Sequence, residues 1–207
     1  MNSRSFVFTG GEWGPWRVTS ERAIAGDPLA PAQCLSVIPA NEWTASQASQ
    51  WILRGTRSNE RYSTRDEKQS LAAIQPQLGR AEATCAALIP IKKSEAWWDL
   101  PQDERRRIFE ERSSHIAIGS KYLPAIARRL YHCRDLETAE PFDFITWFEF
   151  APSATSAFDE LLAVLRASFE WVTSREKLRF AWSAITNRAQ DEILPHSRIW
   201  DNAKFTC

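Results

Sequence analysis

The chain has 207 residues, which is enough for one large domain or two small ones. Its composition, 43% hydrophobic and 25% charged, is that of an ordinary globular protein. Because 26 basic residues balance 26 acidic ones, the charge argues against nucleic acid or an anionic membrane as the main partner. Ten tryptophans and eleven phenylalanines supply flat surfaces that suit cores, interfaces or a planar ligand.

Targeting segments and cysteine motifs are also missing from the sequence. The first residues lack the apolar run of a secretion signal, and no stretch approaches the roughly 18 unbroken apolar residues of a membrane span. We therefore expect a cytoplasmic protein that does not enter a membrane. The four cysteines form no CxxC pair and no CxxCH motif, so we interpret them as reduced thiols rather than as ligands of zinc or attachment points of a covalent haem.

Residues 1–84 form the first predicted unit. They contain one candidate helix, at 63–74, and several short apolar segments typical of strands. We interpret this unit as a reduced ferredoxin-like half that extends the sheet of the unit after it. The strand candidates lie at 5–10, 16–26, 33–39 and 51–57.

Residues 85–185 form the second predicted unit, and residues 186–207 a C-terminal tail. Pro101 and acidic residues open a predicted helix that Pro124 ends, and Ser153 is available to cap a second helix. The order strand, helix, strand, strand, helix, strand predicts an α+β protein of the ferredoxin-like type, with helices on one face of an antiparallel sheet. The expected elements are strand 85–93, helix 100–123, strands 125–132 and 141–150, helix 153–170 and strand 171–182.

Two polar side chains lie in apolar runs of this second unit. His115 lies seven residues from both Ile108 and Tyr122, so we expect its ring on the apolar side of the helix. A core histidine satisfied by a hydrogen bond is the commoner case, and a metal ligand is the alternative. Arg128 alternates with Ile126 and Leu130 on a strand and must find an anion, a carboxylate or water. A structural ion pair is its commoner role, and an anionic substrate answers the same need.

Three segments carry a resemblance to a known family: "IPIKKSEAWW", "HIAIGSKYLPAIARRLYHCRDL" and "PFDFITWFEF". In this order and at these distances, the basic pair, the double tryptophan, the histidine, the arginine and the aromatic strand resemble chlorite dismutase. The short first half is similar to the short-chain lineage of that family. The resemblance spans most of residues 5–172, and the segment after Trp171 fits the family poorly.

The resemblance implies a homodimeric α+β barrel with non-covalent haem b in its second half. His115 matches the proximal iron ligand and Glu170 the carboxylate that hydrogen-bonds this ligand, while Arg128 matches the distal arginine. Tyr62, Lys93 and Trp97 match positions around the haem edge and propionates, and Trp98 matches a packing position beside them. Ser63 departs from the family, which usually has an aliphatic residue there.

The implied reaction converts chlorite to chloride and molecular oxygen. In the family's chemistry, the iron takes one oxygen atom from chlorite, which leaves a ferryl species and transient hypochlorite that Arg128 would retain until the oxygen atoms recombine. The alternatives are a coproheme decarboxylase-like enzyme, a haem carrier without catalysis, and a haem-free dimer of the same fold. Decarboxylases resemble this family but have a neutral residue in place of Arg128 and a full-length first half.

Overall fold

The computed structural model describes residues 4–25, 28–45, 49–57, 61–134, 136–168 and 178–188, with the backbone alone for 22–25 and 178–188. Within these residues, eight strands form a closed barrel. The elements in chain order are β1 (Ser5–Gly11), β2 (Trp16–Ala25), β3 (Cys34–Pro39), β4 (Ser49–Thr56), α1 (Arg65–Ile74), β5 (Cys85–Lys93), α2 (Glu95–Trp98), α3 (Gln102–Arg106), a π-helical turn (Arg107–Glu111), α4 (His115–Ser120), β6 (Ile126–His132), β7 (Phe144–Phe150), a 3₁₀ turn (Pro152–Ala154), α5 (Thr155–Ala167) and β8 (Leu178–Arg188).

Both halves of the barrel have the ferredoxin-like strand order. The order around the barrel is β1-β3-β2-β8-β5-β7-β6-β4, with every pair antiparallel. In each half, the first strand therefore lies between the third and the fourth, and the second strand lies beyond the third. This confirms the expected α+β fold class. The first half also closes the barrel, through β2 on β8 and through one residue pair, Thr56 and His132, between β4 and β6.

The expected helix over 100–123 is wrong as one continuous element. The chain there forms α3, a π-helical turn and the separate helix α4. Ser114 has a φ of 51°, the left-handed conformation that an α-helix of L-residues does not continue through. The heptad spacing of His115 with Ile108 and Tyr122 therefore does not run along a single helix axis.

Two smaller expectations also need correction. Ser153 does not cap α5, because it lies in the preceding 3₁₀ turn and Ala154 is the N-cap residue. The last strand, described over 178–188, continues past the expected end at residue 182 and past residue 185, the expected end of the second unit. Residues 171–177 lie outside the described part of the chain.

Alternating side chains along the central strands build two cores. On β5, Leu88 faces the core shared by both halves, which includes Phe8, Leu53 and Trp147. Its neighbour Ile89 belongs to the second core, which α5 covers. This alternation of faces is what the period of a β-strand requires. Strand β7 is covered on both faces, so all seven of its residues are buried.

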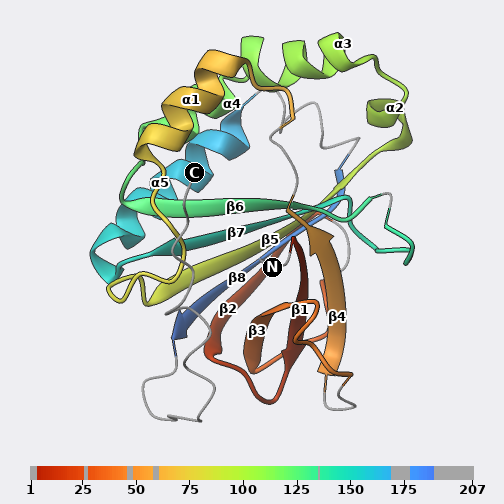
Figure 1. Cartoon of the computed structure of the whole chain (residues 1–207), viewed down its shortest axis with the longest axis vertical. Coiled ribbons are helices and arrows are strands. Elements are labelled where there is room, and N and C mark those ends of the chain that lie inside the picture. Colours follow the sequence, from red (N-terminus) through yellow and green to blue (C-terminus); the bar gives the residue numbers. More distant parts are fainter. Residues whose placement is uncertain are drawn as a thin grey trace.

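The helices lie at one end of the molecule. Figure 1 shows α1, α4 and α5 above the surface of β5, β7 and β6, with α2 and α3 continuing this layer, while β1 to β4 form the opposite end. Among the described residues, none of the helices has the length and apolarity needed to cross a bilayer. The space between the helical layer and the sheet is where the functional site is built.

Candidate functional site

A cavity of about 710 Å³ lies between the helical layer and the strands of the second half. This volume is within the usual range for ligand and cofactor pockets. All of the site residues expected from the sequence that fall in the described part of the chain line it: Tyr62, Lys93, Trp97, His115 and Arg128. They come from five separate segments, so the fold brings together what the sequence keeps apart. Glu170 lies outside the described residues.

His115 occupies the first position of α4. Glu110 accepts hydrogen bonds from the backbone N–H groups of Ile116 (2.6 Å) and Ala117 (3.4 Å), so its carboxylate caps the helix in place of Ser114. The ring of Phe109 stacks on the His115 imidazole at 4.3 Å between centroids, with 27° between the planes. The π-helical turn therefore supplies two neighbouring residues that fix this histidine, one through the helix and one through its ring.

Arg128 reaches the cavity from β6, on the face opposite to that of Arg129. Its carbonyl accepts a hydrogen bond of 2.6 Å from Gln75 Nε2. Its guanidinium lies against α4: a Cβ atom on Gly119 would be 3.8 Å from Arg128 Nη1. Gly119 follows His115 by one helical turn, so the arginine and the histidine face the same space from the strand and from the helix.

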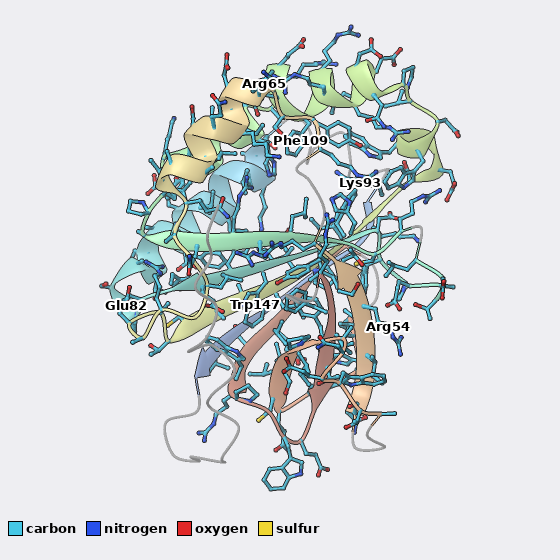
Figure 2. All side chains as sticks on the ribbon, viewed as in Figure 1. Arg54, Arg65, Glu82, Lys93, Phe109 and Trp147 are labelled. Atoms are coloured by element: carbon cyan, nitrogen blue, oxygen red, sulfur yellow. The ribbon has the colours of Figure 1, made fainter. Side chains whose placement is uncertain are left out.

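Tyr62, Trp97 and Lys93 form a third wall. The Tyr62 ring lies edge-on to Trp97 at 6.1 Å and also contacts Phe109 at 5.8 Å. The Lys93 ammonium lies 4.4 Å from the centre of the Trp97 ring. Figure 2 shows Lys93 and Phe109 on the helical side of the sheet, above Trp147. Aromatic rings and a cation thus continue from His115 along the edge of the cavity.

Tyr62 is held by an ion pair between two helices. Arg106 of α3 donates to both carboxylate oxygens of Glu67 of α1, at 2.9 and 3.0 Å, and also to the Tyr62 carbonyl. Glu67 completes the capping box of α1 with Thr64. The hydrogen bond from Arg106 is the main cause that lowers the pKa of Glu67 to about 2. Tyr62 itself has a φ of 66°, so this anchoring fixes a backbone conformation that tyrosine rarely adopts.

The cavity wall is strongly cationic. Among the described residues that line the cavity, there are six arginines and one lysine and no aspartate or glutamate. The whole chain has a formal net charge of zero, so this is a local segregation of charge. A concave surface lined by one sign of charge concentrates ions of the opposite sign. The arrangement therefore favours anions.

Two buried donors test whether a haem fits this cavity. The Tyr62 hydroxyl and the Trp97 indole Nε1 are inaccessible to solvent and have no hydrogen-bond partner among the described residues. Both residues line the cavity, where carboxylate oxygens of a ligand would satisfy them. His115 offers an imidazole nitrogen, and the apolar members of the wall, such as Ile91, Ile116 and Leu123, suit a flat ring system. The residues present fit a haem with its propionates.

Several residues of the site escape sequence reasoning. Phe109 and Glu110 fix His115 only because the helix is interrupted by a π-helical turn, which no residue pattern indicates. The Arg106 and Glu67 pair joins segments 39 positions apart. The one available signal was the capping-box pattern of Thr64 and Glu67 before an apolar segment. The cationic wall collects residues from many elements and leaves no local motif.

Fold and site together define a ferredoxin-like barrel protein whose second half holds a basic, cofactor-sized cavity with one histidine at a helix start. A family model described as chlorite dismutase matches residues 36–184. A solved structure of a dimeric chlorite dismutase from Nitrobacter winogradskyi is 49% identical, with a TM-score of 0.78 over 88% of this chain and 99% of that one. The chain belongs to the chlorite dismutase family.

Two further matches are more limited. The chlorite dismutase of Ideonella dechloratans is 34% identical over 80 residues, which are 39% of this chain and only 25% of that protein. A structure of chlorite dismutase from Candidatus Nitrospira defluvii in complex with imidazole is 18% identical, with a TM-score of 0.61 over 90% of this chain and 92% of that one. At that identity, the likeness concerns the fold alone.

Proposed function

We propose that this protein is a haem b-dependent chlorite dismutase that converts chlorite to chloride and molecular oxygen. The observation that carries the proposal is the shared cavity of His115 and Arg128, whose lining includes seven arginine and lysine residues and no aspartate or glutamate among the described residues. Such a wall suits a cofactor with carboxylates together with a small anionic substrate. Membership of the chlorite dismutase family supports the same chemistry.

In this proposal, His115 ligates the iron of haem b, and Tyr62, Lys93 and Trp97 hold the propionate edge. Tyr62 and Trp97 contribute the two unsatisfied donors and Lys93 a positive charge. A bound haem b supplies an iron centre able to accept an oxygen atom from chlorite. Glu110 and Phe109 keep His115 in one orientation, so the ligand nitrogen is positioned before the cofactor arrives. Glu170 is proposed to hydrogen-bond the histidine ring and increase its basicity.

Arg128 is proposed to orient chlorite and then to retain the hypochlorite left after the first oxygen transfer. A guanidinium keeps its charge at every relevant pH and donates to oxyanions in a fixed geometry. Retention lets the hypochlorite oxygen and the transferred oxygen form one O₂ molecule while chloride leaves, so each chlorite yields one chloride and one O₂. Escape of hypochlorite would instead oxidise the protein, whose ten tryptophans are susceptible.

The proposal includes a homodimer in the cytoplasm. The homodimer is supported by the dimeric chlorite dismutase structure, which is similar over 88% of this chain. Light scattering coupled to size exclusion gives the molar mass directly. A mass near that of two 23.7 kDa chains is expected, and a mass of one chain would contradict the dimer.

The function is tested by loading the purified protein with hemin and following oxygen with an electrode after chlorite is added. Free hemin at the same concentration is the control. We expect rapid release of about one O₂ per chlorite consumed, with the free hemin far slower. A histidine-ligated Soret band without oxygen release would refute the dismutase activity and favour the decarboxylase or carrier alternatives.

A further inference from the structure

The cavity contains two arginines that the proposed function does not use. Arg57 directly follows β4, and Arg129 lies on β6, so both stand where the first and second halves of the barrel meet. Strands β4 and β6 pair only at Thr56 and His132, so they separate next to these arginines. Residues on both sides of this seam therefore belong to the lining of the cavity.

Arg129 and Arg128 point to opposite faces of β6. Arg128 pairs with Phe148, a member of the core beneath α5, whereas Arg129 pairs with Trp147, a member of the core inside the barrel. Both residues line the cavity, and they lie in the part of β6 that is not paired with β4. The Arg129 side chain therefore does not share the position of the Arg128 guanidinium, which lies against α4.

Neither guanidinium has a hydrogen bond or an ion pair within the described residues. The buried carboxylate of Glu149, whose charge acts on Arg129, accepts hydrogen bonds from Trp147 Nε1 (2.9 Å) and from the Gly79 backbone N–H (2.5 Å). Burial lowers the pKa of Arg129, and the charge of Arg57 lowers it further, while Tyr131 and Glu149 act in the opposite direction. Two partly buried cations close enough to repel one another are stabilised by an anion that contacts both.

We propose that Arg57 and Arg129 form a second anion subsite in the cavity, at the seam between β4 and β6, that takes small inorganic anions such as chlorite and chloride. This inference rests on the proposed function, since chlorite would pass this subsite on entry and chloride on exit. Its role is to raise the local concentration of the anion next to Arg128. Arg57 and Arg129 therefore act on capture and leave the reaction at Arg128 unchanged.

Chloride NMR line width tests the subsite without haem or turnover, because chloride that exchanges with a protein site broadens in proportion to the sites occupied. The purified full-length chain is measured as isolated and after hemin loading. The variants are Arg57→Gln, Arg129→Gln and the matched control Arg17→Gln, which removes an exposed arginine of β2 outside the cavity. We expect the excess line width to fall about twofold in either cavity variant and to stay at the wild-type value in the control. Nitrite, a bent anion like chlorite, should displace the chloride.

An unchanged line width in Arg57→Gln and Arg129→Gln, with native circular dichroism, would overturn the subsite. If Arg129→Gln fails to fold, Arg57→Gln alone decides, because the Arg57 guanidinium makes no hydrogen bond and no ion pair within the described residues. In the active enzyme, the same two variants should lower kcat/KM for chlorite about tenfold through KM, with kcat retained and a weaker dependence on salt. A protein that releases no oxygen but loses chloride broadening in these variants would contradict the proposed function and retain the subsite.

Discussion

The two halves of the barrel share a strand order but differ in what connects the strands. In the second half, the connections hold α2 to α4 after β5 and α5 after β7, and these helices enclose the cavity. In the first half, four residues, 12–15, link β1 to β2, and the described residues between β3 and β4 contain no helix. The same sheet therefore yields a site only where helices cover it. The reduced half contributes a closed barrel and a core.

The two halves also differ in how tightly their side chains pack around glycine. The first half is tightly filled: a Cβ atom on Gly10 would lie 2.2 Å from the Trp51 ring. In the second half, a Cβ atom on Gly119 would find only ordinary contact at 3.8 Å with Arg128. The comparison assigns the filled barrel core mainly to the first half and the helices that enclose the cavity to the second, while Tyr62 and Arg57 of the first half also line the cavity. The predictions below test this division.

Arg128→Ala has the largest expected effect, and it is confined to chemistry in the second half. Losing the guanidinium over the cavity should lower the rate of chlorite turnover about tenfold and shorten the active lifetime, because less hypochlorite is retained. An oxygen electrode gives the turnover rate and the total oxygen yield before inactivation. A hypochlorite scavenger in the same assay gives the amount of hypochlorite that escapes. The turnover rate and active lifetime of Arg128→Lys should lie between those of the wild type and those of Arg128→Ala. The control Arg17→Ala should match the wild type. Equal yield and lifetime in Arg128→Ala would make this arginine structural.

Gly10→Ala should destabilise the protein without touching the site. The added methyl group clashes with Trp51, and overpacking of this kind costs about 1–3 kcal/mol of the free energy of unfolding. The matched change in the second half, Gly119→Ala, has room and gains helix propensity, so it should stabilise by up to about 1 kcal/mol. Urea unfolding gives both values. If Gly119→Ala lowered the free energy of unfolding more than Gly10→Ala does, the proposed contrast in packing between the halves would be wrong.

Glu110→Ala should weaken hemin binding, with a smaller effect than the changes predicted above. Removing a helix cap costs about 1 kcal/mol, which corresponds to about a fivefold loss of affinity if it acts through His115. Hemin titration followed at the Soret band measures this loss. Glu111→Ala, which removes an exposed neighbouring carboxylate, is the control and should leave the affinity unchanged. An equal effect of both substitutions would remove the special role of Glu110.

The smallest expected effect is a dependence of stability on pH through Glu67. Its pKa is lowered from 4.5 to about 2 in the folded state, so its contribution is complete above pH 4.5 and is lost as the pH falls through 2. Between about pH 6 and pH 3, the melting temperature of the wild type should therefore drop more than that of Glu67→Gln. Glu82→Gln, which removes a more exposed ion pair, should behave like the wild type. If the melting temperatures of Glu67→Gln and the wild type fell in parallel with pH, the ion pair of Glu67 with Arg106 would contribute nothing to stability.

Much of the fold was predictable because strands and α5 carry local signals. The aromatic segment that became β7 and the apolar segment that became β5 have compositions that favour strands in any context. The break before His115 was not predictable, since it depends on Ser114 in a left-handed conformation and on a cap from Glu110. The end of β8 was placed too early, at residue 182, for a similar reason: the extent of this strand is set by pairing with β2 and β5, which lie far away in the sequence.

Five residues of the candidate site were expected from the resemblance to a family: Tyr62, Lys93, Trp97, His115 and Arg128. The sequence did not predict the cavity that all five line. Arg57 and Arg129 illustrate why. Their importance depends on the seam between β4 and β6, and the residues around each carry no motif. A charge-balanced sequence gives no hint that seven arginine and lysine residues line one cavity, because that segregation is created by folding.

The central claim is that the cavity of the second half binds haem through His115. A hemin titration of His115→Gln beside His132→Gln tests it most directly, because His132 is a buried histidine of the same half that does not line the cavity. We predict that His115→Gln loses the histidine-ligated Soret band while His132→Gln keeps it with one hemin per chain. An unchanged spectrum in His115→Gln, or equal losses in two folded variants, would contradict the account.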